Sequence, residues 1–212
     1  GSDHQLAKFC MMGFKIRSVS RTLNRHIDDF PGLERVVYLF TLNDPVGDRR
    51  ALEMYQEIDD LMHLRTNLLS ERVGEFLTGR SHAAQWVGAR IARQQISART
   101  VERYNYLFGD NAGWKQTKDL LERMKRRCDH KGCEFVIVLF PLLYELAEYP
   151  FAAAHAAVRE FAQEADIRFV DLLERFEGED ETGYWVHPRD FHPNHRAHRA
   201  AAEHLYDAID WE

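Results

Sequence analysis

Cysteine, long apolar runs and excess positive charge are all scarce in this chain, and each scarcity argues against a class of protein. The 212 residues include three cysteines, Cys10, Cys128 and Cys133, and no CxxC pair. This pattern favours reduced thiols in a cytoplasmic protein over a disulfide framework. No apolar run in the sequence is long enough to span a bilayer. The net charge of -6 argues against a nucleic-acid-binding protein.

The remaining composition is that of an ordinary globular domain. Hydrophobic residues make up 45% of the chain and charged residues 29%, and the length fits one domain with a sizeable core. Short apolar runs predict strands at 36–40, 135–140 and 168–172, the first two buried on both faces. Between them, periodic patterns predict helices at 5–28, 49–63, 66–96, 114–127, 151–165 and 195–209. Such alternation predicts a parallel sheet in a three-layer α/β domain.

One section of the chain differs from this alternation. Residues 49–110 are helical in pattern, with an interruption at 79–81, and contain no catalytic spacing. We interpret them as a helical insertion or cap within a single domain that spans residues 1–212. Residues 178–183 are acidic and predict a loop.

The stretch Asp190-Phe191-His192-Pro193-Asn194 contains the strongest candidate for chemistry. A carboxylate two residues before a histidine can accept from one ring nitrogen and leave the other free to act as a base. Asn194 is a candidate N-cap for the last predicted helix. The structural alternative is a histidine that merely precedes a capped helix.

A second candidate, Asn43, follows the predicted strand 36–40 within Leu42-Asn43-Asp44-Pro45. Because ligands bind beyond the C-terminal ends of parallel strands, we expect Asn43 and residues 190–194 at the same edge. An asparagine amide in that place can donate to an oxyanion. The alternative is that Asn43 and Asp44 only form a turn.

Several other residues are weaker candidates. Tyr144 and Trp185 are expected to line a substrate pocket, or else to pack in the core or at its rim. A histidine cluster near the C-terminus permits a metal site, although no known ligand motif is present: His187, His192, His195 and His198. The serines of the chain lie in helical or polar surroundings and are expected to face solvent: Ser18, Ser20, Ser70, Ser81 and Ser97.

Together, the two motifs around Asn43 and His192 resemble the SGNH (GDSL-type) hydrolase family. The resemblance implies a flavodoxin-like α/β fold with a Ser nucleophile, a Gly and an Asn in the oxyanion hole, and an Asp/His pair. It assigns Asn43 to the oxyanion hole, and Asp190 and His192 to the pair. Two departures are visible: Thr41 stands where the family has Gly, and Asp-x-His replaces the usual Asp-x-x-His.

The nucleophile block of that family, Gly-Asp-Ser, is absent from the sequence. Residues 1–6 resemble the family's second block, in which Gly1 would offer its N–H to the oxyanion. On this interpretation the chain lacks its first two strands, and the serine lies upstream of residue 1. Alternatively, Gly1 and Ser2 derive from a cloning linker.

The resemblance therefore implies an esterase that hydrolyses or transfers an acyl group, such as acetyl, from a small-molecule or glycan ester. It implies neither a cofactor nor a metal. The alternatives are an inactive α/β module that binds a ligand or protein, and a metal-dependent hydrolase that uses the histidine cluster. Substrate, oligomeric state and membrane association are left open by the sequence.

Overall fold

The computed structural model describes residues 6–9, 15–69, 82–187 and 190–209. Three strands form the main sheet: β1 (Arg35–Thr41), β2 (Glu134–Phe140) and β3 (Arg168–Asp171). A separate two-stranded hairpin consists of β4 (Trp185–His187) and β5 (Asp190–Pro193). The helices are α1 (Ile16–His26), α2 (Arg49–Leu69), α4 (His82–Leu107), α5 (Ala112–Lys131), α6 (Ala152–Glu164), α7 (Leu173–Phe176) and α8 (His195–Ala208). Short 3-10 turns lie at Ile27–Asp29, Leu146–Glu148 and Glu181–Tyr184.

The main sheet is parallel, as the sequence predicts, and its strands follow the order β1-β2-β3. β2 is the central strand, and its apolar side chains are buried on both faces of the sheet. Phe135, Ile137 and Leu139 pack into one core cluster. Val136, Val138 and Phe140 pack into the other. This alternating burial is what a strand covered by helices on both sides requires.

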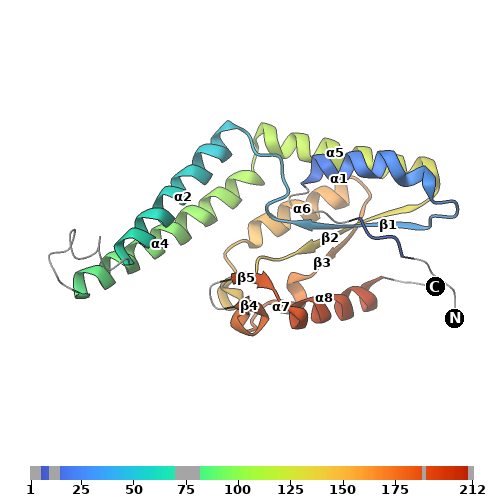
Figure 1. The fold of residues 1–212 in the computed structure, drawn as a ribbon. Helices are drawn as coiled ribbons and strands as arrows, with labels where there is room; N and C mark the ends of the chain where they lie inside the picture. The colour runs from blue at the N-terminus through green and yellow to red at the C-terminus, as the bar shows by residue number, and fades with distance from the viewer. Residues whose placement is uncertain (1–5, 10–14, 70–81, 188–189, 210–212) are drawn as a thin grey trace.

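Helices cover both faces of the sheet and complete a three-layer arrangement. α1, α5 and α6 pack on one face, where their buried residues form a cluster with β1 and β2. α7 and α8 pack on the other face, over residues of β2 and β3. Figure 1 shows α1 and α5 above the sheet and α8 below it.

The prediction that residues 36–40 are buried on both faces is wrong for one face of β1. Tyr38 and Phe40 are buried, but Val37 is 38% exposed and Leu39 is 51% exposed. The register pairs Val37 with Val136 and Leu39 with Val138, so these side chains share the face on which α8 packs. α8 covers β2 and β3 on that face and leaves β1, at the end of the strand order, uncovered.

Local sequence signals set the ends of α5. Its N-cap is Asn111, whose Oδ1 accepts the Trp114 N–H at 2.8 Å. Its C-cap is Gly132, at φ +80°, a left-handed conformation that glycine adopts without penalty. By contrast, the predicted helix 5–28 is shorter: α1 begins at Ile16, and residues 6–9 form no regular structure.

The section interpreted as an insertion contains two long helices packed against each other, α2 and α4. They extend together away from the sheet (Figure 1). Residues 66–69 belong to α2, and α4 continues to Leu107, beyond the predicted end at 96. The predicted interruption at 79–81 lies outside the described residues. Within the described ranges, no helix is both long and apolar enough to cross a membrane.

The hairpin β4–β5 was not predicted. The sequence patterns predict no strand at 185–187 or 190–193, yet the two segments pair antiparallel, with Trp185 opposite Pro193 and His187 opposite Asp190. His192 therefore lies on a short strand directly before α8, not in a loop. The expected closing helix 195–209 matches α8 to within one residue.

Candidate functional site

Asp190 and His192 form the pair that their spacing predicts. The Nδ1 atom of His192 lies 2.5 Å from Oδ1 of Asp190, and the His192 backbone N–H donates to the same oxygen at 3.1 Å. These hydrogen bonds, from the ring and then from the backbone, lower the pKa of Asp190 below its ordinary value. The carboxylate therefore fixes the imidazole with Nδ1 as the donor.

The other ring nitrogen of this pair is accessible. The side chain of His192 is 87% exposed and that of Asp190 is 49% exposed. Among the described residues, nothing forms a hydrogen bond with Nε2 of His192. A neutral imidazole held in this way presents an acceptor to solvent, which is the arrangement of a general base.

Asn194 fixes the C-terminal end of β5. Its Oδ1 accepts from the backbone N–H groups of Arg196 at 2.9 Å and Ala197 at 3.1 Å, so the predicted N-cap of α8 is confirmed. Its Nδ2 donates to the carbonyls of Gly183 at 3.1 Å and Trp185 at 2.9 Å. One asparagine thus links the start of α8 to β4. α8 follows β5, the strand that contains His192, and β4 pairs with β5.

Asn43 lies in a tight turn directly after β1. Asp44 closes this turn: its backbone N–H donates to the Thr41 carbonyl at 3.0 Å, and its Oδ2 accepts from the Thr41 N–H at 2.9 Å. The same oxygen accepts from the Tyr38 hydroxyl at 3.0 Å. Burial raises the pKa of Asp44 above its ordinary value, and these bonds oppose that rise. Asp44 therefore has a structural role that the sequence interpretation did not separate from Asn43.

The turn leaves the side chain of Asn43 exposed. Its Oδ1 accepts the Thr41 hydroxyl at 2.6 Å, so the carbonyl end of the amide is fixed toward the strand. Within the described parts of the chain, its Nδ2 has no acceptor. Thr41, at the position where the resembled family has glycine, orients Asn43 so that its N–H₂ group is available as a donor.

The hairpin and the Asn43 turn lie on the same side of the molecule. Figure 1 shows the C-terminal ends of the parallel strands pointing to the left of the view, where β4 and β5 also lie. α2 and α4 extend from this side. That Asn43 and residues 190–194 meet at this edge of the sheet stays a prediction.

Tyr144 and Trp185, the weaker pocket candidates, both make hydrogen bonds within the protein. The Tyr144 hydroxyl lies 2.5 Å from the Ser97 hydroxyl, which joins α4 to the loop after β2. The Trp185 indole N–H donates to the Leu143 carbonyl at 2.7 Å. Its ring lies 4.6 Å from that of Phe191, measured between centroids. Both residues thus border the hairpin or the adjoining loop, and their role toward a substrate stays a prediction.

Two serines differ from expectation. Ser20 is buried, because it lies on the side of α1 that faces the core, and Ser97 is partly buried against Tyr144. Gly1, Ser70 and Ser81 lie outside the described residues. No serine in the described ranges forms a hydrogen bond with His192. Over the same ranges, no three His, Cys, Asp or Glu side chains group as metal ligands would.

Sequence reasoning missed a buried Asp–His pair. His155 Nδ1 lies 2.8 Å from Asp171 Oδ1, with side chains 3% and 2% exposed. The Tyr149 hydroxyl lies 3.1 Å from His155 Nε2. Asp171 also accepts from Arg159 at 2.8 Å and from the Leu173 N–H at 3.0 Å. The only signal in the sequence was an aspartate ending an apolar strand.

Comparison of the chain with protein-family models, with curated proteins and with solved structures found no match.

Proposed function

We propose that this chain is the larger part of a serine ester hydrolase of the SGNH type, with a flavodoxin-like sheet. The observation that carries the proposal is the 2.5 Å hydrogen bond between Asp190 and His192 on an exposed hairpin. It supplies an oriented base with an accessible Nε2. Asn43, in the turn after β1, supplies an exposed amide donor, and the C-terminal end of β1 lies toward the side of the molecule that holds the hairpin (Figure 1).

The edge of β1 that is unpaired among the described strands is where we place the strand that would contain the serine. Parallel strands in the order β1-β2-β3 match three consecutive strands of a flavodoxin-like sheet, whose first strand would then pair with β1. Val37 and Leu39 are exposed on the uncovered face of β1, where an added strand and its helix would bury them. A serine at the C-terminal end of such a strand would lie beside Asn43.

The mechanism follows from these positions. His192 Nε2 takes the proton of the serine hydroxyl as the oxygen attacks the ester carbonyl, and the oxyanion accepts from Asn43 Nδ2. Asp190 holds Nδ1–H and stabilises the imidazolium. His192 then returns the proton to the leaving alcohol. Water, or a second alcohol, resolves the acyl-enzyme by the same route.

A fluorophosphonate probe tests this proposal, because it forms a covalent bond only with an activated serine. The protein is expressed with the sequence that its gene encodes before Gly1, and the labelled peptide is identified by mass spectrometry. We expect one labelled serine upstream of Gly1 and loss of labelling in His192→Ala.

A matched control variant is available on α2. His63 lies 3.5 Å from Asp59 in an exposed ion pair, so His63→Ala removes an exposed histidine with an aspartate partner and should label normally. If no serine reacts, the chain is better explained as a non-catalytic binding module. If His192→Ala reacts like the wild type, His192 is not the base of the labelled serine and the proposal fails.

A further inference from the structure

The buried Asp171–His155–Tyr149 network joins three segments at the C-terminal edge of the sheet. Asp171 ends β3, His155 lies in α6, and Tyr149 lies in the connection between β2 and α6. Asp171 accepts three N–H groups, from His155, Arg159 and Leu173. A carboxylate that accepts from these groups cannot also donate, so the proton of the bond with His155 lies on Nδ1.

The remaining bonds of the network involve the Tyr149 hydroxyl. Among the described residues, His155 Nε2 is the acceptor within reach of the Tyr149 hydroxyl, so we assign Tyr149 as the donor. The Tyr149 oxygen in turn accepts the Leu142 backbone N–H at 3.1 Å. Burial raises the pKa of Tyr149 well above its ordinary value, so the hydroxyl keeps its proton. Each donor in the network has an acceptor, and the loop after β2 is fixed at Leu142.

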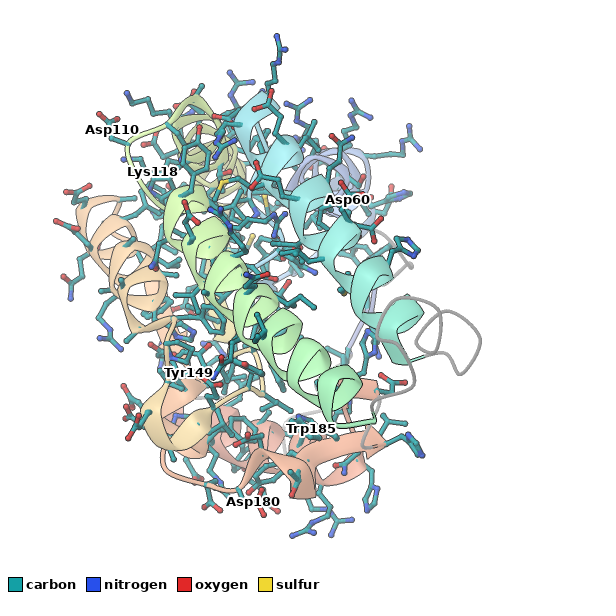
Figure 2. All side chains as sticks on the ribbon, turned by 90° about the vertical axis from the view of Figure 1, so that its left-hand side faces the viewer. Asp60, Asp110, Lys118, Tyr149, Asp180 and Trp185 are labelled. Carbon is teal, nitrogen blue, oxygen red and sulfur yellow. The ribbon has the colours of Figure 1, made fainter. Side chains whose placement is uncertain are left out.

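This loop contacts the hairpin that contains His192. Leu143, the next residue, is buried, and its carbonyl accepts the Trp185 indole N–H at 2.7 Å. Trp185 is the first residue of β4, and its ring packs on the ring of Phe191. In the sequence, Phe191 stands between Asp190 and His192. Figure 2, viewed from the left of Figure 1, shows Tyr149 and Trp185 in the lower part of the molecule, where the hairpin also lies.

We propose that Asp171, His155 and Tyr149 are positioning residues for the Asp190–His192 pair and act through residues 142–143 and Trp185. The catalytic role of that pair rests on the proposed function, whereas the positioning of the pair by the network does not. The hairpin is short and its catalytic side chains are exposed, so its own packing constrains it weakly. A buried network with satisfied polar groups supplies the rigidity that a base needs.

The test measures the hairpin directly, without an activity assay. Tyr149→Phe removes the hydroxyl and keeps the ring, which leaves Leu142 N–H without its acceptor. We expect hydrogen exchange of the Trp185 indole N–H to quicken by about tenfold, the effect of losing one hydrogen bond. We also expect the pKa of Asp190, followed through its carboxyl ¹³C signal, to rise toward its ordinary value as its bond to His192 loosens.

Tyr106→Phe is the matched control. Its hydroxyl donates to Asp48 at 2.7 Å near the start of α2, apart from the network, so it should leave both signals unchanged. If Tyr149→Phe does not fold, Trp185→Phe cuts only the last link and should raise the pKa of Asp190 in the same way.

The inference would be overturned if folded Tyr149→Phe kept the wild-type pKa of Asp190 and the wild-type exchange rate of the Trp185 indole N–H. It would also be overturned if Tyr106→Phe changed both quantities as much as Tyr149→Phe does. An unchanged Asp190 in Trp185→Phe would overturn it too. None of these outcomes depends on a serine or on turnover. A failure here therefore leaves the fluorophosphonate result intact, and a failure of labelling leaves the positioning network intact.

Discussion

Two of the Asp–His pairs in the described residues, Asp190–His192 and Asp171–His155, share an Asp–His bond and differ in their surroundings. In both, an aspartate oxygen faces His Nδ1, at 2.5 Å for Asp190–His192 and at 2.8 Å for Asp171–His155. The histidine side chain is 87% exposed in the first pair and 3% exposed in the second. His192 Nε2 is accessible, whereas His155 Nε2 is occupied by Tyr149.

Both pairs have the Asp–His bond, so their difference lies in access to Nε2. A buried imidazole with both nitrogens bonded joins segments of the fold and cannot reach a substrate. An exposed imidazole with one nitrogen bonded can accept a proton from a substrate. We expect the two pairs to respond oppositely to mutation, the exposed pair in activity and the buried pair in stability.

The largest contrast is expected in turnover. In the protein that includes its upstream sequence, His192→Ala should lower kcat for a short-chain ester by about 10⁴-fold, because general acid–base catalysis is lost. His155→Gln keeps one donor and one acceptor and should cause a much smaller loss. Steady-state kinetics with both variants measures the ratio. Equal losses would remove the distinction between the pairs.

Stability should show the reverse order. Asp171→Ala leaves His155 and the Leu173 N–H buried without their acceptor, which should lower the free energy of unfolding by about 3 kcal/mol. Asp190→Ala removes a largely exposed carboxylate, and its urea midpoint should stay close to that of the wild type. Urea titrations followed by circular dichroism compare the two variants. A larger loss for Asp190→Ala would contradict the assignment.

Chemical modification should separate the two histidines without mutation. Diethyl pyrocarbonate attacks neutral imidazoles that it can reach, so His192 should react in the native protein. His155 should stay unmodified until urea unfolds the chain. Peptide mapping by mass spectrometry reports both sites in one sample, with exposed His63 as the internal reference. Rapid native modification of His155 would show that the network opens readily.

The smallest effect concerns pH. The hydrogen bond from His192 lowers the pKa of Asp190 below its ordinary value of 3.8. Any stability that the pair contributes is therefore full above that value and is lost as the pH falls through the lowered folded-state pKa. In His192→Ala the pKa of Asp190 should rise, as measured by carboxyl ¹³C NMR. A value unchanged from the wild type would mean that the bond is not formed in solution.

The sequence predicted the parts of the structure that depend on neighbouring residues. Asp190 and His192 are two positions apart, so their bond needs little beyond the local backbone, and the same is true of the Asn194 cap. The apolar run 135–140 likewise marked β2. These signals act within a few residues and are independent of the tertiary fold.

The remaining features depend on tertiary packing. His155, Asp171 and Tyr149 meet only because α6 packs beside β3, which no spacing rule indicates. The burial of Ser20 and the exposure of Leu39 depend in the same way on which helix covers which strand. The hairpin was missed because its strands are short, although Trp185-Val186-His187 and Phe191-His192 contain residues that favour strands.

The coding sequence upstream of Gly1 tests the proposal that Asp190 and His192 serve a serine on a strand beside β1. We predict that the upstream reading frame encodes two short apolar strands, the first of which ends in Gly-Asp-Ser. A start codon or an unrelated sequence in that place would leave His192 without a nucleophile and would contradict the claim.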